Sequence, residues 1–93
     1  MKDDRVGPVE VWLTLQDAGF GVRGRLVFDD ESDTDIDVTS LSIRGAQREW
    51  TAWLLDQGYK AAGRWQTEAQ DSEGTDWEVS RKFAPGENAK PMR

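Results

Sequence analysis

The chain has 93 residues, which leaves room for one domain with a modest core, of the size that buries roughly 60% of its unfolded surface. It contains no cysteine and no histidine, which excludes a disulfide framework and a thiolate zinc site and removes the usual catalytic base and the most reactive nucleophile. The net charge is −6. We therefore expect a protein that is not an enzyme and needs no cofactor.

The N-terminal residues 1–5 are charged and are followed by no apolar stretch of the kind that a signal peptide needs. No apolar run approaches the ~18 residues of a membrane-spanning helix. From these features and from the absence of cysteine we expect a cytoplasmic protein that does not enter a membrane.

Alternating apolar residues predict three β-strands in the first half of the chain. The first is Val9–Leu15, and a loop at 16–20 with glycine chemistry suited to a hairpin connects it to a second strand at 21–29. The third covers residues 35–43, where the apolar phase shifts midway and predicts a β-bulge near Thr39 and Ser40. The residues that we expect to face the core from the first two strands are Val9, Val11, Leu13, Leu15, Val22, Leu26 and Phe28.

A helix is predicted at residues 46–57, because apolar side chains recur there at helical spacing. The predicted buried side of this helix consists of Ala46, Trp50, Trp53, Leu54 and Gln57. Its two tryptophans are therefore expected to pack in the core and not to stack on a ligand. Leu55 points away from this side and is either exposed or in contact with a distant loop. Gly58 is expected to end the helix in the left-handed conformation, with Tyr59 packing behind it.

Two further alternating segments, at 63–69 and 76–84, are joined by the polar connector 70–75 and predict a β-hairpin. Trp65 and Trp77 are expected to be core residues or cross-strand partners. The expected fold class is α+β, with a mainly antiparallel five-stranded sheet in the order β-β-β-α-β-β and one helix packed on one face. Residues 1–84 form this single domain, and residues 85–93, with two prolines and no apolar periodicity, are expected to form a flexible tail.

The net charge arises from one acidic loop, which places six acidic residues in nine positions: Asp29, Asp30, Glu31, Asp33, Asp35 and Asp37. Removing these from the 18 acidic residues leaves 12, which equals the number of basic residues, so the rest of the chain is electrically balanced.

One hypothesis for this loop is a cation site, because Asp33, Asp35 and Asp37 have the spacing of the first ligands of a calcium loop. That loop also requires Gly where this chain has Val38 and Glu where it has Arg44. We therefore predict no metal site. A weak divalent-ion site stays open as an alternative to a solvated turn whose charges keep other sheets away.

A second hypothesis for the acidic loop is a DNA mimic, in which closely spaced carboxylates imitate phosphates and occupy a basic DNA-binding protein. Such mimics spread acidic residues over much of their surface. The confinement of the acid to one loop counts against this interpretation.

The face of the sheet opposite the core is the other candidate binding site. Its predicted binding residues are Trp12, Arg23, Arg25, Arg64 and Lys82. An aromatic ring among cations is typical of a single-stranded nucleic-acid platform and of a protein–protein hot spot. Glu10, Glu68 and Glu78 fall on the same face, so an ordinary surface of paired charges is the simpler interpretation. Because the acidic loop would repel a phosphate chain, a protein partner is favoured over nucleic acid.

The run at 44–50, followed by Trp53-Leu54, Gly58-Tyr59 and Gly63-Arg64-Trp65, resembles short proteins of high-GC actinobacteria and their phages or plasmids. This resemblance covers about half of the chain and implies a bacterial or phage origin. The resemblance implies no function, and from the sheet face around Trp12 and the acidic loop we expect a small accessory protein that acts by binding another protein through one or both of them. The alternatives are single-stranded nucleic-acid binding through the sheet face, a DNA-mimic inhibitor, and self-association into a homodimer through exposed strand edges.

Overall fold

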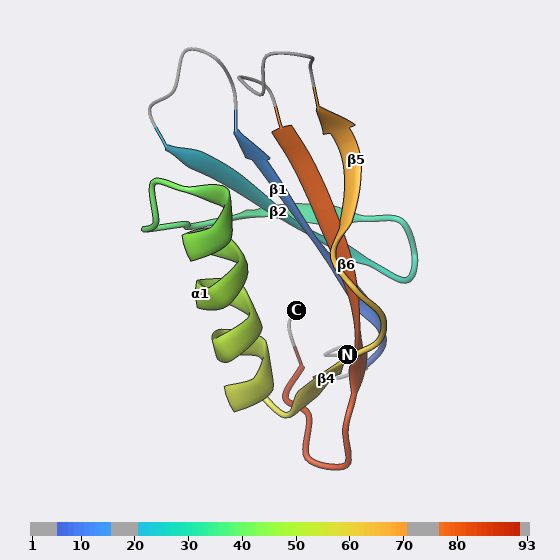
Figure 1. Ribbon diagram of the computed structural model, residues 1–93. Coiled ribbons are helices and arrows are strands. Elements are labelled where there is room, and N and C mark those ends of the chain that lie inside the picture. The colour runs from blue at the N-terminus through green and yellow to red at the C-terminus, as the bar shows by residue number, and fades with distance from the viewer. Residues whose placement is uncertain (1–5, 16–20, 71–76, 92–93) are drawn as a thin grey trace.

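The computed structural model describes residues 6–15, 21–70 and 77–91. Within these ranges the chain forms one helix and six strands, and Figure 1 shows their arrangement. The elements are β1 (Val9–Leu15), β2 (Val22–Phe28), β3 (Asp33–Ile36), α1 (Ile43–Asp56), β4 (Tyr59–Ala61), β5 (Gln66–Gln70) and β6 (Trp77–Pro85). Three segments discussed above lie outside the described residues: the charged N-terminal residues 1–5, the expected hairpin loop at 16–20, and residues 71–75 of the expected connector.

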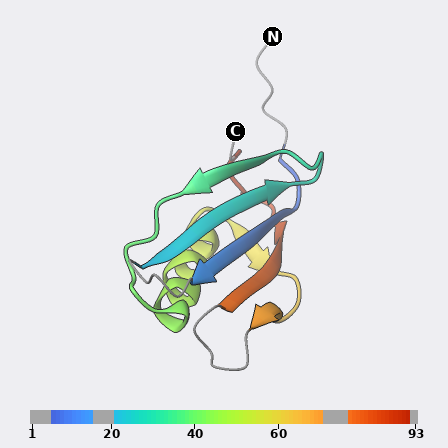
Figure 2. The same cartoon turned by 90° about the horizontal axis from the view of Figure 1, so that it is seen from above.

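The strands pair antiparallel in the order β3-β2-β1-β6-β4. The remaining strand, β5, pairs with the first half of β6, and β4 pairs with its end. The helix contacts β1 and β4 and covers one face of the sheet, as Figure 2 shows from above. The expected α+β class with one helix on an antiparallel sheet is confirmed. The sheet has one strand more than the five predicted, because β4 is only three residues long and too short to show an alternating pattern.

Alternation along β1 separates an inner face, which α1 covers, from an outer face. Val9, Val11 and Leu13 are all less than 5% exposed, and Val22 and Leu26 of β2 join them in the core. The strand bounds of β1 and the core assignments in β2 agree with the prediction. From the other half of the chain the core receives Ile43, Ala46, Leu54, Tyr59, Val79 and Phe83.

The predicted third strand exists, but its predicted bounds of 35–43 are wrong, because β3 begins at Asp33 and ends at Ile36. Residues 37–42 form no strand and are fixed by side chains of the helix. The Glu49 carboxylate accepts hydrogen bonds of 3.0 to 3.1 Å from the backbone N–H groups of Thr39 and Ser40, and the Trp50 indole donates to the Asp37 carbonyl at 3.1 Å. These bonds satisfy backbone groups that a sheet would otherwise pair, so the expected bulge is absent from this segment.

The helix begins at Ile43, three residues before the predicted start. Ser42 caps it, because its hydroxyl oxygen accepts a hydrogen bond of 3.0 Å from the Gly45 N–H. Ile43, Ala46 and Leu54 are buried and Trp50 is partly buried against the core. Trp53, which we expected to be buried, is 41% exposed, and Leu55 is 52% exposed.

The helix ends as expected at Gly58, which has a φ of +92°. A side chain there is also excluded by packing, because a Cβ would lie 2.8 Å from the Cα of Ala89. The following Tyr59 is 2% exposed, and its hydroxyl donates to the Lys90 carbonyl at 2.9 Å. Burial raises the pKa of this hydroxyl above its ordinary value.

The predicted C-terminal hairpin is confirmed, with β5 and β6 paired and a register irregularity between Thr67 and Ala69. Trp65 and Trp77 are partly buried and pack against the core. The predicted mobility of residues 85–93 stays a prediction; in the described part, Gly86 and Lys90 donate backbone hydrogen bonds to Gly58 and Gln57. Among the described residues, no helix is long and apolar enough to cross a membrane.

Candidate functional site

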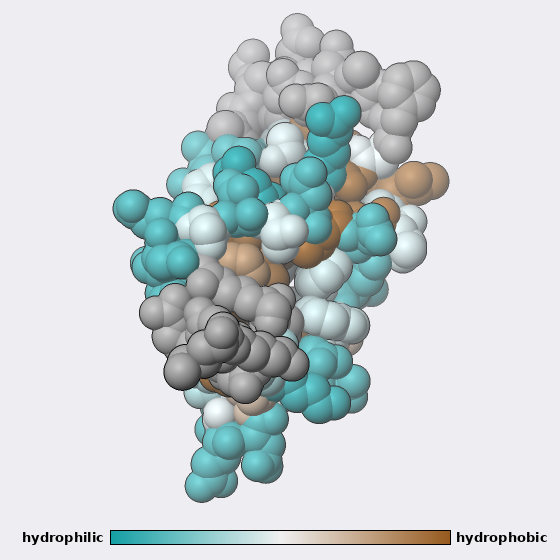
Figure 3. Space-filling view, turned by 180° about the vertical axis from the view of Figure 1, so that it is seen from behind, coloured by the Kyte–Doolittle hydropathy of each residue, from teal (hydrophilic) through white to brown (hydrophobic). Residues whose placement is uncertain are grey.

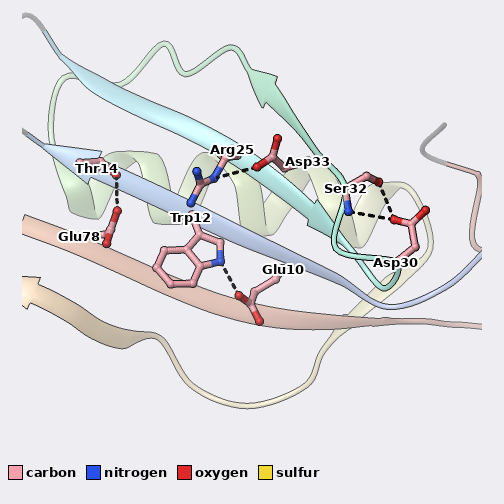
Figure 4. Close-up of polar contacts among 8 residues, drawn as sticks. All are labelled: Glu10, Trp12, Thr14, Arg25, Asp30, Ser32, Asp33 and Glu78. Carbon is pink, nitrogen blue, oxygen red and sulfur yellow. Dashed lines mark hydrogen bonds and ion pairs between the residues drawn. The ribbon is translucent and has the colours of Figure 1, made fainter.

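Trp12 lies at the centre of the outer face of the sheet. It is half-buried, and the neighbouring strands place Arg25 on one side of it and Ser80 on the other. Its indole N–H donates to the Glu10 carboxylate two residues earlier on the same strand. Figure 4 shows Glu10, Trp12 and Arg25 on the side of the sheet that faces away from the helix. The indole is therefore fixed in place while part of its ring stays open to solvent.

The Arg25 guanidinium lies over this indole, with its Cζ atom 5.8 Å from the ring centroid, a cation–π geometry. Its Nε is 3.8 Å from a carboxylate oxygen of Asp33 on β3, and Asp35 lies directly opposite Arg25 in the strand register. Both side chains of this ion pair are about half exposed, 46% and 51%. Arg25 thus has partners on both sides within the protein, but its charge stays half exposed and the ion pair is a weak one.

A hollow of about 430 Å³ opens beside Trp12, where the edge strand is interrupted between β4 and β5. Arg64 and Lys82 line it, and neither forms an ion pair within the described part of the chain. Glu10 and Glu68 line it as well, and Glu68 accepts a hydrogen bond of 2.7 Å from the buried Ser80 hydroxyl. The hollow therefore presents cations and carboxylates together beside one aromatic ring.

The structure thus brings together three of the five predicted face residues, Trp12, Arg64 and Lys82, around one hollow. Arg25 contacts Trp12 but does not line the hollow. Arg23 is exposed on the same face opposite Thr14 and away from the hollow. Thr14 itself donates a hydrogen bond of 3.1 Å to Glu78, so part of this face consists of the paired polar groups expected of an ordinary sheet surface. Seen from behind, hydrophilic side chains cover most of the visible surface around a smaller apolar area (Figure 3).

The acidic loop forms the turn from β2 to β3 and then the edge strand β3. Its six acidic residues are all exposed: Asp29, Asp30, Glu31, Asp33, Asp35 and Asp37. The turn is held by Asp30, which accepts hydrogen bonds from the backbone N–H and the hydroxyl of Ser32, and Glu31 has a φ of +71°. Over the described residues, no group of three or more acidic side chains is arranged to hold a metal ion.

A second, larger groove was not predicted from the sequence. It has a volume of about 530 Å³ and lies between the exposed side of α1 and the segment that carries Trp65. Its cations are Arg44 and Arg48 of α1 and Arg81 of β6. The signal was present in the sequence as two arginines four residues apart on the helix, in line with the apolar Leu55 and with no acidic residue between them on that side.

Arg81 lines both the hollow beside Trp12 and the groove on α1, because it lies where the edge strand is interrupted. The register of β6 places it opposite Val11, on the helix side of the sheet. Its Nε donates a hydrogen bond of 2.8 Å to the Gly63 carbonyl, and its guanidinium lies 6.0 Å from the Trp65 ring centroid. These contacts fix the side chain before any ligand arrives.

Comparison with protein-family models, curated proteins and solved structures finds no match to this chain.

Proposed function

We propose that this chain is a small, non-catalytic accessory protein of the bacterial cytoplasm that binds another protein through the hollow beside Trp12. The observation that carries the proposal is a partly exposed, hydrogen-bonded tryptophan at the same hollow as two cations, Arg64 and Lys82, that form no ion pair with any described residue. Tryptophan and arginine are the residue types that dominate binding energy at protein interfaces. A ring that is already fixed loses little conformational entropy on binding.

The charges of the hollow favour a protein over single-stranded nucleic acid. Glu10 and Glu68 line it together with the cations, so a phosphate chain would meet carboxylates at the positions where it needs counter-charges. A protein surface can offer both signs of charge and match this pattern. The DNA-mimic alternative rests on the acidic loop, where Asp33 is already engaged by Arg25 and the acid stays confined to one turn and one short strand.

The test is an affinity capture from a bacterial lysate with and without nuclease, comparing Arg64→Glu with Arg23→Glu. Both variants reverse one exposed charge, but only Arg64 lines the hollow. We expect Arg64→Glu to release the captured protein and Arg23→Glu to retain it. Equal retention by both variants would remove the hollow from the interface.

A second pair of variants compares the contributions of Trp12 and Trp53 to partner binding. Trp12→Ala should lose the partner, whereas Trp53→Ala, which removes a more exposed indole from the helix side, should keep it. Loss of the captured material after nuclease treatment, together with direct binding of single-stranded DNA at low salt, would favour the nucleic-acid alternative.

A further inference from the structure

We propose that the groove between α1 and Trp65 is a second binding site, distinct from the hollow beside Trp12, and that its ligand is a short acidic segment of a protein in extended conformation. Among the described residues, its lining contains three guanidinium groups and no carboxylate, although the whole chain carries a net charge of −6. Arg44 and Arg48 lie one helical turn apart on the same side of α1, where like charges repel each other, and a ligand anion would relieve this repulsion. We call this site the arginine groove and define it by Arg44, Arg48, Thr51, Leu55, Trp65 and Arg81.

The cations of the arginine groove come from two elements and converge on one space. Arg44 and Arg48 are exposed, lie one helical turn apart on α1, and form no ion pair within the described part of the chain. Arg81 faces them from the sheet, and its Nε is occupied by the Gly63 carbonyl. Its two terminal nitrogens therefore remain as donors in the fork geometry that matches a carboxylate.

The apolar part of the arginine groove indicates a peptide and not a free anion. Leu55 is 52% exposed at one end, and Trp65 is partly buried along the wall. A ligand that offers carboxylates and an apolar side chain fits both kinds of surface.

The length of the groove also fits a short segment. From Arg44 to Leu55 the helix rises about 16 Å, which is the length of roughly five extended residues. A single-stranded nucleic acid gains its affinity from many phosphates, and three guanidiniums would neutralise about three of them. The remaining phosphates would extend over a surface of net negative charge, whereas a peptide with two or three carboxylates ends where the groove ends.

The experiment is a titration of the purified chain with a synthetic peptide of alternating Glu and Leu, followed by calorimetry and by amide shifts in NMR spectra. A peptide with Gln in place of every Glu is the ligand control. The test variant is Arg44→Gln with Arg48→Gln. The matched control is Arg23→Gln with Lys60→Gln, which removes the same two charges at exposed positions outside the arginine groove.

We expect the Glu peptide to bind and to shift the amides of residues 44–55, and the Gln peptide to bind at least about fivefold more weakly. The Arg44/Arg48 variant should lose about five- to tenfold in affinity, and the control variant should change less than about twofold. Binding should weaken steeply as salt is raised. Circular dichroism of each variant establishes that it is folded.

Three results would overturn the proposal. The first is no binding of the Glu peptide at low salt, or an equal loss in the two variants. The second is tighter binding of a short oligothymidylate than of the Glu peptide, which would make nucleic acid the ligand. The third is a concentration-dependent increase in mass that Arg44→Gln with Arg48→Gln abolishes, which would make the acidic loop of a second copy the occupant. Failure of the Trp12 hollow as an interface would leave this outcome unaffected, because Arg44 and Arg48 do not line it.

Discussion

On the inner side of β1, Val11 and Leu13 are fully buried beneath the helix, whereas on its outer side Trp12 and Thr14 are only half-buried and donate hydrogen bonds to carboxylates. The two sets alternate along the same seven residues. Inner residues gain stability from excluding water, and outer residues gain only the modest net energy of exposed polar pairs. The residues that stabilise the fold and the proposed binding residues therefore lie on opposite faces of one strand, and each set can be changed while the other is kept.

The hollow beside Trp12 and the arginine groove differ in the charges that line them. The one beside Trp12 contains both signs of charge, with each carboxylate in a hydrogen bond, and the arginine groove contains cations alone. Balanced charge suits a surface that discriminates among protein partners, and unbalanced charge suits attraction of one kind of ligand.

The largest expected effect is that of Leu13→Ala on the inner face. Leu13 is 0% exposed, so the substitution leaves a cavity and should lower the free energy of unfolding by about 3 kcal/mol. Trp12→Ala on the outer face should cost about 2 kcal/mol, because only about half of this large side chain is buried. Urea unfolding measures both. A loss for Trp12→Ala equal to that of Leu13→Ala would show that the outer face is part of the core.

Next in size is Gly58→Ala at the end of the helix. The substitution forces a residue with a Cβ to a φ of +92° and places that Cβ 2.8 Å from Ala89, so we expect a loss of about 2 kcal/mol. Gly63→Ala is the matched control, since Gly63 has a φ of +121° but no atom within 4 Å of the added carbon, and it should cost about 1 kcal/mol. The difference measures how firmly the C-terminal segment packs on the helix end. Equal losses of unfolding free energy in the two variants would show that the C-terminal segment moves aside without cost.

The sequence predicted what depends on local periodicity. β1 was found with its bounds, the inner residues of β2 were assigned correctly, and Gly58 was identified as the helix end. Each of these follows from spacing or from a backbone conformation that one residue type adopts.

The sequence did not predict what depends on contacts between distant residues. The third strand was placed over 35–43 because Leu41 and Ile43 look like strand residues, yet Leu41 is 79% exposed and Ile43 opens the helix beneath a Ser42 cap. Glu49 prevents a strand here, because its carboxylate binds the backbone N–H groups of Thr39 and Ser40, ten and nine residues earlier in the chain. Trp53 was expected to be buried, but the helix is set against β1 and β4 so that Leu54 faces the core and Trp53 faces outward.

The candidate sites show the same limit. The alternation of apolar and polar residues along the first strand was enough to place Trp12 on the outer face. The hollow beside Trp12, however, exists because the chain leaves the edge of β6 between β4 and β5. The arginine groove requires Arg81, which lies on the inner side of β6 and meets the helix arginines only in the folded chain. No local sequence pattern predicts that these three arginines lie close together.

A smaller effect is expected for Glu49→Gln, in the segment that joins the two faces. Burial opposes ionisation of Glu49, but the hydrogen bonds from Thr39 and Ser40 outweigh it and lower the pKa of the carboxyl below its ordinary value. A lowered folded-state pKa stabilises the protein above the unfolded-state value, and this stabilisation is lost as pH falls through the folded-state pKa. At neutral pH we therefore expect Glu49→Gln to cost about 1 kcal/mol.

The measurement is the free energy of unfolding of the original chain and of Glu49→Gln as a function of pH. Their difference should be constant near neutral pH and shrink once the pH falls below the ordinary range of a glutamate. A difference that stays constant down to strongly acidic pH would mean that the ionised carboxylate does not hold residues 39–40.

The smallest expected effect is that of Arg25→Gln on the outer face. Arg25 and Asp33 are half exposed and their charged atoms are 3.8 Å apart, so solvent and salt screen the pair. Removing it should change the free energy of unfolding by less than about 0.5 kcal/mol at physiological salt. Urea unfolding at low and high salt gives the value, and the change should disappear at high salt. A loss above about 1 kcal/mol that persists at high salt would mean that Arg25 stabilises the fold through its contact with Trp12, and the outer face would then serve stability as well as binding.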